Sequence, residues 1–254
     1  MPTVRQKTAQ QASNSATTAR PGPKPAGRAS RLAALGLHTD MDLLLHLPLR
    51  YEDETQLVPI ADLLRSAGRI GGQALQVEGV VSACEVQYRP RRQLVVTLAE
   101  ADPDADNPAP AGGAQLTLRF LNFYGSQLKQ LAVGNRVRAR GEVRIGFFGA
   151  EMVHPSYKIV NPGAPLPDSL TPVYPSGDGV PQAYLRRAID TAIKRADWRD
   201  TLPPALRARL RLAPFEQSVR LLHNPPPDVD RNALQDRSHP AWVRMKFDEL
   251  LAQQ

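Results

Sequence analysis

The feature that most constrains the fold is an alternation of apolar and polar residues with a period of two, between residues 73 and 160. Such alternation is typical of β-strands that bury one face. Three strands are predicted first, a short helix follows over 126–132, and two more strands come after it. The predicted strands are 73–81, 93–98, 115–120, 136–143 and 157–160. This order of elements is that of a five-stranded OB-fold β-barrel.

Helical patterns flank the predicted barrel on both sides, so the predicted class is α+β. Before it, Ser30 and Thr39 each begin a short helix, and Asp42 stands in the capping-box position relative to Thr39. These helices are too short to bury much surface alone, so we expect them to pack on downstream residues. After a Pro-rich linker, helices are predicted over 180–196, 203–212, 214–223 and 239–253. The predicted division is a disordered basic tail (1–28), an N-terminal helical segment (29–72), the barrel (73–162) and a C-terminal helical region (163–254).

Several protein classes are excluded by composition. The chain has no run near the ~18 apolar residues of a membrane span and no apolar signal-peptide region, so we expect a cytoplasmic chain without membrane contact. One Cys excludes a disulfide framework, and the five His show no metal-ligand spacing. No Gly is followed by Lys, so the phosphate-binding P-loop is absent. We therefore expect no catalytic residue, cofactor or metal in this chain.

The charge balance is basic, at +7, and 26 of the 32 basic residues are Arg. Five basic residues and no acidic one fall within residues 1–28, so the rest of the chain is close to neutral. The planar Arg guanidinium suits phosphate and base contacts. An excess of Arg also follows from genome base composition, so charge alone is a weak argument for nucleic acid.

An aromatic cluster follows the third predicted strand, where Arg119 and Phe120 lead to Phe123 and Tyr124. Exposed aromatic rings on a barrel bind bases by stacking, for ~1–3 kcal/mol each. The alternative is that Phe120 and Phe123 belong to the barrel core. Alternation along the strand predicts that at least one ring of the cluster points outward.

Two clusters of Arg are candidates for phosphate contacts. Arg89, Arg91 and Arg92 fall at the turn between the first two strands, where they either contact phosphate or keep the turn soluble. Arg138 and Arg140 belong to a row that also contains Arg136 and Arg144, all predicted to point the same way. Such a row requires a counter-charge, which is either Glu142 and Glu151 or a polyanion.

Three consecutive carboxylates, Glu52, Asp53 and Glu54, could in principle hold a metal for a nuclease. Adjacent side chains diverge in most backbones, so a solvated turn is the preferred interpretation.

Six ordered segments resemble a known family. They are 44–53, 119–123, 149–155, 170–175, 239–241 and 247–251. Together they are similar to the N-terminal portion of the RecG family of bacterial ATP-dependent DNA helicases, over about residues 30–254. The resemblance implies that the barrel is a wedge domain, which binds the branch point of a stalled fork or Holliday junction and separates the strands. Departures from the family are Glu54 in place of a common Arg, Leu121 in place of an aromatic residue, and a long acidic loop over 101–113.

The first hypothesis is therefore a junction-binding wedge region of a RecG-like helicase acting in recombination and repair. ATP and Mg²⁺ are expected only for a motor that this chain lacks, and its predicted last helix breaks off without a cap. Expected partners are branched DNA and a single-stranded-DNA-binding protein, for a monomer in the nucleoid of a bacterium. The alternative is a stand-alone OB-fold protein that binds single-stranded nucleic acid. The candidate DNA contacts are Phe120, Tyr124, Phe123, Arg119, Arg89, Arg91, Arg92, Arg138 and Arg140.

Overall fold

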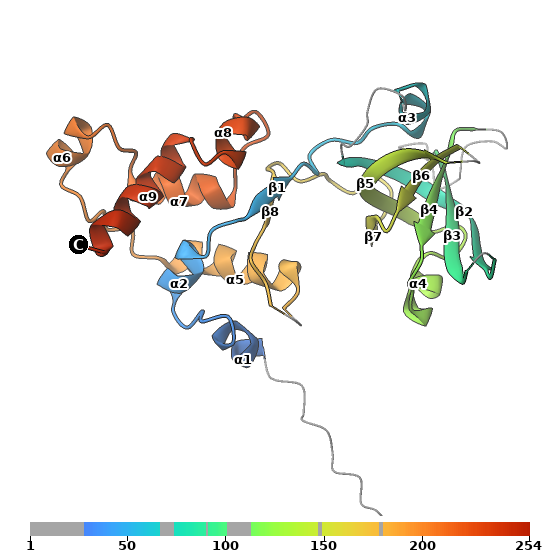
Figure 1. The fold of residues 1–254 in the computed structure, drawn as a ribbon, viewed down its shortest axis with the longest axis horizontal. Coiled ribbons are helices and arrows are strands. Elements are labelled where there is room, and N and C mark those ends of the chain that lie inside the picture. Colours follow the sequence, from blue (N-terminus) through green and yellow to red (C-terminus); the bar gives the residue numbers. More distant parts are fainter. Residues whose placement is uncertain (1–27, 67–73, 90, 101–112, 147–148, 178–179) are drawn as a thin grey trace, which may run out of the picture.

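A computed structural model describes residues 28–66, 74–89, 91–100, 113–146, 149–177 and 180–254. Residues 1–27 of the predicted tail and 101–112 of the predicted acidic loop lie outside the described residues. Figure 1 shows two bodies joined by two extended segments of chain. One body is built on a β-sheet and is called the sheet body. The other is mainly helical and is called the helical body.

The sheet body is a mixed β-sheet with two short helices. Its elements are α3 (Ile60–Ser66), β2 (Ala74–Gln87), β3 (Gln93–Glu100), β4 (Gln115–Phe120), α4 (Gly125–Gln130), β5 (Arg136–Gly146), β6 (Gly149–Val153) and β7 (Ser156–Ile159). The strand order is β2-β3-β4-β6-β5-β7, and β2 also pairs with β5. Only the β4–β6 pair is parallel among the described strands. The α+β class is confirmed.

One predicted strand assignment is incomplete. The sequence pattern predicts a single strand after 136–143, near 157–160, but the structure has two, β6 and β7. The strand that pairs with both β4 and β5 is β6, whereas β7 pairs with β5 alone. With five residues, β6 shows only two buried positions, Ala150 and Met152, which is too little alternation to be read from sequence.

The core of the sheet body comes from residues at every second position of its strands. Its members include Val77, Val96, Leu98, Leu116, Leu118 and Met152, and Ile60 and Leu63 of α3 cover it. Gly79 lies within β2, and the irregularity in this strand lies later, between Val81 and Ala83. What Gly79 provides is close packing, since a Cβ there would lie 2.6 Å from the Ala99 carbonyl oxygen.

The helical body surrounds a second core. Its elements are α1 (Arg28–Ala33), α2 (Asp40–Leu45), β1 (Arg50–Glu52), β8 (Thr171–Val173), α5 (Gln182–Arg195), α6 (Pro204–Arg209), α7 (Phe215–His223), α8 (Arg231–Gln235) and α9 (Pro240–Ala252). The capping box of Thr39 and Asp42 begins α2 as predicted. Leu43 and Leu44 of α2 pack in one cluster with Leu185 and Ile189 of α5. The expected packing of the N-terminal helices on downstream residues is therefore confirmed.

A fully buried guanidinium, that of Arg244 on α9, fixes the end of the helical body. It contacts Asp200 at 2.6 Å and Asp248 at 2.9 Å, and it donates to the Ala213 carbonyl oxygen. The hydrogen bonds from Arg244 hold the pKa of Asp200 well below its usual value. The buried positive charge of Arg244 is thus compensated by the negative charges of Asp200 and Asp248, as a buried charge requires.

The acidic triplet links the two bodies, which corrects the interpretation of a solvated turn. Glu52 pairs with Arg140 of β5 at 3.2 Å, and Glu54 pairs with Lys158 of β7 at 2.9 Å. Asp53 turns the other way and pairs with Arg231 of α8 at 2.6 Å. Consecutive carboxylates do diverge, but each meets a cation that is distant in sequence. Together these residues bind the connecting segment to both bodies.

Candidate nucleic-acid interface

The candidate interface lies at the end of the sheet body where the β2–β3 turn meets the segment 121–124. Leu94 pairs with Phe120 across β3 and β4, so the residues just beyond these two positions are neighbours. The Arg92 guanidinium accordingly lies over the Phe123 ring, 4.3 Å from its centroid. A shallow pocket of about 300 Å³ is lined by Arg92 and residues 121–124. Arg92 and Phe123, two predicted contacts from different parts of the chain, are therefore brought together.

Tyr124 is the most exposed aromatic residue of the predicted cluster, with 79% of its surface accessible. It directly precedes α4, and its backbone N–H donates to the Gln127 side chain at 2.9 Å. This bond fixes the backbone at the start of α4 while the ring stays outside the core. Among the predicted aromatic residues, Tyr124 is the one with a ring free to stack.

The β2–β3 turn holds Arg89 and Arg91, which are both exposed, beside Arg92. It also exposes Tyr88, at 72%, a residue that the sequence analysis did not single out. A signal was present, because Tyr88 follows Gln87 at the polar end of a strand and directly precedes the Arg cluster. An aromatic side chain next to phosphate-binding cations is the usual composition of a single-strand-binding surface.

Phe120 is placed differently from the prediction, since it is only 3% exposed. It points to the same side of β4 as Leu116 and Leu118, and it packs edge-on against Tyr157 with a centroid distance of 5.6 Å. Alternation along β4 therefore buries this ring. A ring in this position presents no free face to a base.

Three of the predicted Arg contacts are neutralised within the protein. Arg119 lies 2.5 Å from Glu151, and Arg140 pairs with Glu52. Arg138 is buried, where it pairs with Glu78 and donates to the carbonyl oxygens of Ala164 and Pro165. The β5 row does have a counter-charge within the protein, but most of it comes from Glu78 and Glu52. Of the two predicted acids, Glu142 pairs with Arg144, and Glu151 pairs with Arg119 of β4.

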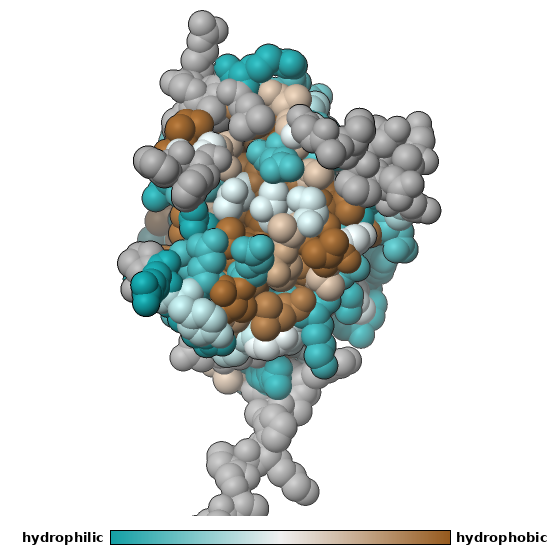
Figure 2. All heavy atoms as spheres, turned by 90° about the vertical axis from the view of Figure 1, so that its right-hand side faces the viewer, coloured by the Kyte–Doolittle hydropathy of each residue, from teal (hydrophilic) through white to brown (hydrophobic). Residues whose placement is uncertain are grey.

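Figure 2 looks onto the sheet-body end of the molecule and shows hydrophobic side chains in the centre of that face, bordered by hydrophilic ones. Apolar contact area and polar groups thus lie side by side there. Within the described residues, no group of three or more His, Cys, Asp or Glu is placed to hold a metal ion. No helix in the same part of the chain is long and apolar enough to cross a membrane.

Comparison with known proteins shows the family to which the chain belongs. Residues 22–196 match the RecG wedge domain family. The chain is 40% identical over 232 residues to the ATP-dependent DNA helicase RecG of Escherichia coli K12, which covers 89% of this chain and 31% of that protein. It is 37% identical to the RecG of Haemophilus influenzae, covering 88% of this chain and 30% of the relative. The chain therefore spans about a third of the length of these relatives.

Among solved structures, RecG bound to a three-way DNA junction matches 80% of this chain and 26% of its own, with a TM-score of 0.55 and 21% sequence identity. At that identity the match establishes the fold alone. The family match over most of the chain establishes more, and by it the protein is a member of the RecG wedge domain family.

Proposed function

We propose that this chain is the branched-DNA-binding wedge region of a RecG-type ATP-dependent helicase. The observation that supports it best is the end of the sheet body, where exposed Tyr124 lies beside the Arg92–Phe123 pair. Bases at a branch point have free faces, whereas bases inside a duplex do not, so an exposed ring selects the place where strands diverge. The guanidiniums of Arg89 and Arg91 would hold the adjacent phosphates.

The proposal extends to the architecture and the division of the chain. The strands of the sheet body form an OB-fold barrel over residues 73–162, supported by the series of pairings that runs from β2 through β3, β4, β6 and β5 back to β2. Residues 29–72 and 163–254 form the N-terminal and C-terminal helical parts, and 1–28 form a basic tail. The protein acts as a monomer on DNA in the bacterial nucleoid, with a single-stranded-DNA-binding protein as a further partner.

An ATP–Mg²⁺ site does not fit the residues of this chain. No Gly is followed by Lys anywhere in the sequence, and the described residues include no carboxylate cluster suited to a metal. ATP hydrolysis is therefore assigned to the two thirds of the RecG relatives that this chain does not match.

The proposed DNA contacts are Tyr124, Phe123, Arg89, Arg91 and Arg92, with Tyr88 as an addition. Phe120 is left out because its ring is buried, and Arg119, Arg138 and Arg140 are left out because acidic residues already neutralise them.

The test compares binding of a three-way junction with binding of a duplex of the same arm sequence, by fluorescence anisotropy. Replacing Tyr124 with Ala should weaken junction binding by about 1–3 kcal/mol, the value of one stacked base, and should leave duplex binding nearly unchanged. Tyr124→Phe keeps the ring and should retain the preference for the junction. Val133→Ala, at another exposed apolar position of the sheet body, is the matched control.

Two results would contradict the proposal. A folded Tyr124→Ala variant that still prefers the junction as strongly as the parent protein would mean that Tyr124 does not contribute to recognition of the branch point. Equal affinity of the parent protein for a single strand and for the junction would favour a stand-alone single-strand-binding protein instead.

A further inference from the structure

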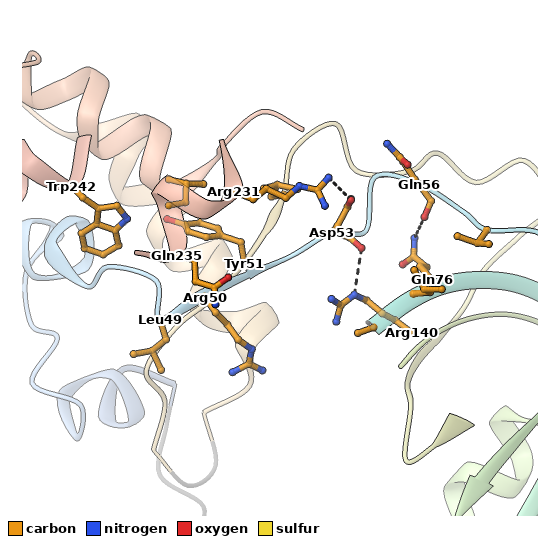
Figure 3. A pocket seen from close by; sticks show the side chains of 15 residues that line it. Leu49, Arg50, Tyr51, Asp53, Gln56, Gln76, Arg140, Arg231, Gln235 and Trp242 are labelled. Carbon is orange, nitrogen blue, oxygen red and sulfur yellow. Dashed lines mark hydrogen bonds and ion pairs between the residues drawn. The ribbon is translucent and has the colours of Figure 1, made fainter. Parts of the chain in front are cut away.

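A second site lies between the two bodies, away from the candidate interface. It is a cavity of about 600 Å³, enclosed by the connecting segment, by β2 and β5 of the sheet body, and by α8 and α9 of the helical body. Its size falls within the roughly 300–1,000 Å³ of small-molecule sites. Figure 3 shows that side chains from both bodies face this space.

The strongest indication of a ligand is the indole of Trp242 on α9. Trp242 is 6% exposed, and its Nε1 is a buried donor without a hydrogen-bond partner. In Figure 3 this nitrogen points toward Tyr51 and Gln235 on the side of the cavity. A buried donor left without an acceptor destabilises the folded state, so an acceptor in the cavity would remove this penalty.

The charges around the cavity favour an anion. Arg50, Arg140 and Arg231 line it from three separate segments, and Asp53 is its one lining carboxylate. Glu52, just outside, pairs with Arg50 and Arg140, so three cations face two acidic groups. Each guanidinium has five N–H donors, and Arg50 and Arg231 keep half or more of their side-chain surface exposed. Donors therefore remain available for a phosphate group.

The rest of the lining is apolar or carries amides. Leu49, Leu75, Leu170 and Leu234 provide apolar surface, and Gln235 provides an exposed amide. A ligand that fits must combine an anionic group with a flat, partly apolar ring that accepts hydrogen bonds. We propose that the cavity between Trp242 and Arg231 binds a nucleotide, with its phosphate on the arginines and an acceptor of its base on the Trp242 N–H.

A free mononucleotide and one nucleotide of a DNA strand share this chemistry. The chain has only two Trp, and Trp198 does not line the cavity. A Trp198→Phe protein therefore reports on Trp242 alone by fluorescence. It is titrated with thymidine monophosphate, with a short oligothymidylate and with inorganic phosphate. We expect a saturable change with the mononucleotide or the oligonucleotide, and the probe that binds identifies the source.

Variants test the assigned groups. Arg231→Gln should weaken binding about tenfold or more, as expected for one charge-assisted hydrogen bond, whereas Arg220→Gln, which removes an exposed paired Arg elsewhere in the helical body, should not. Trp242→Phe keeps an aromatic side chain but replaces the indole and removes its N–H donor, and calorimetry should show a similar loss of binding. Tyr124→Ala, at the candidate interface, should leave this binding unchanged. A failure of the proposed function can therefore be distinguished from a failure of the proposed nucleotide site.

Three outcomes would overturn the assignment. The first is the lack of a saturable fluorescence change with either nucleotide probe at millimolar concentration. The second is equal affinity for inorganic phosphate and for the nucleotide. The third is binding that neither Arg231→Gln nor Trp242→Phe weakens in folded protein.

Discussion

Acid is expected to destabilise the helical body through one buried side chain, His223 of α7. His223 is 1% exposed. Its Nε2 lies 2.9 Å from the Leu44 carbonyl oxygen, and its Nδ1 lies 2.8 Å from the Tyr174 hydroxyl oxygen. A carbonyl oxygen only accepts, so Nε2 holds the proton and Nδ1 accepts from Tyr174. Protonation at Nδ1 would reverse this hydrogen bond, leaving the Tyr174 hydroxyl without its acceptor, and would place a charge in the core.

The size of the effect follows from the pKa of His223. This pKa is lowered from 6.5 to about 4, chiefly by burial; the hydrogen bond to the Leu44 carbonyl opposes the shift, and nearby His46 adds to it. Between these two values the unfolded chain binds more protons than the folded one. The contribution of His223 to the free energy of unfolding is therefore fully present above pH 6.5 and is lost as the pH drops toward 4. The expected loss is about 2 kcal/mol by pH 5 and about 3 kcal/mol in total.

Urea denaturation followed by Trp fluorescence measures this loss, because both Trp198 and Trp242 lie in the helical body. The free energy of unfolding is compared at about pH 7.5 and pH 5 for the parent protein and for His223→Gln. The variant should start less stable but should lose little on acidification, whereas His38→Gln, at an exposed position, should behave as the parent. An equal loss in the parent and in His223→Gln would refute the assignment to this imidazole.

Three further substitutions test the packing of the two bodies. Arg244→Met removes the cation that pairs with Asp248 and leaves Asp200 with Arg207 alone, so urea denaturation should show a loss of about 3–5 kcal/mol. Gly79→Ala should cost about 1–3 kcal/mol because its Cβ would meet the Ala99 carbonyl, whereas Gly125→Ala meets nothing within 4 Å and should leave the midpoint unchanged or higher. Thr39→Ala removes the cap of α2 and should lower the free energy of unfolding by about 1 kcal/mol.

The sequence was informative where the structure depends on local patterns. The strands β2 to β5 were predicted because one face of each is buried, and the cap at Thr39 was predicted because both of its partners lie within four residues. The orientation of Phe120 was predictable by the same rule, since it stands two and four residues after Leu118 and Leu116, which are buried. An aromatic residue next to an Arg is typical of a base-binding surface, but alternation along the strand decides where the ring of Phe120 points.

Long-range contacts could not be read in this way. The strands β1 and β8 have three residues each, are separated by more than a hundred positions, and include Pro172. Tyr88 and Tyr124 belong to different turns, and only the pairing of β3 with β4 places both at the same end of the sheet body. The spacing of residues along the sequence does not show which turns lie at the same end of a sheet.

The acidic triplet shows what this limit means for function. Seen as three neighbouring carboxylates, it predicted a solvated turn, yet Glu52 and Glu54 bind the sheet body while Asp53 binds the helical body. Tyr51, the residue before it, donates from its hydroxyl to the Leu222 carbonyl oxygen in the helical body at 2.8 Å. These polar contacts are partly exposed, and such ion pairs are individually weak and screened by salt. Polar interfaces of this kind permit relative motion of domains. The orientation of Tyr124 relative to the helical body therefore depends on a few ion pairs rather than on a core shared by the two bodies.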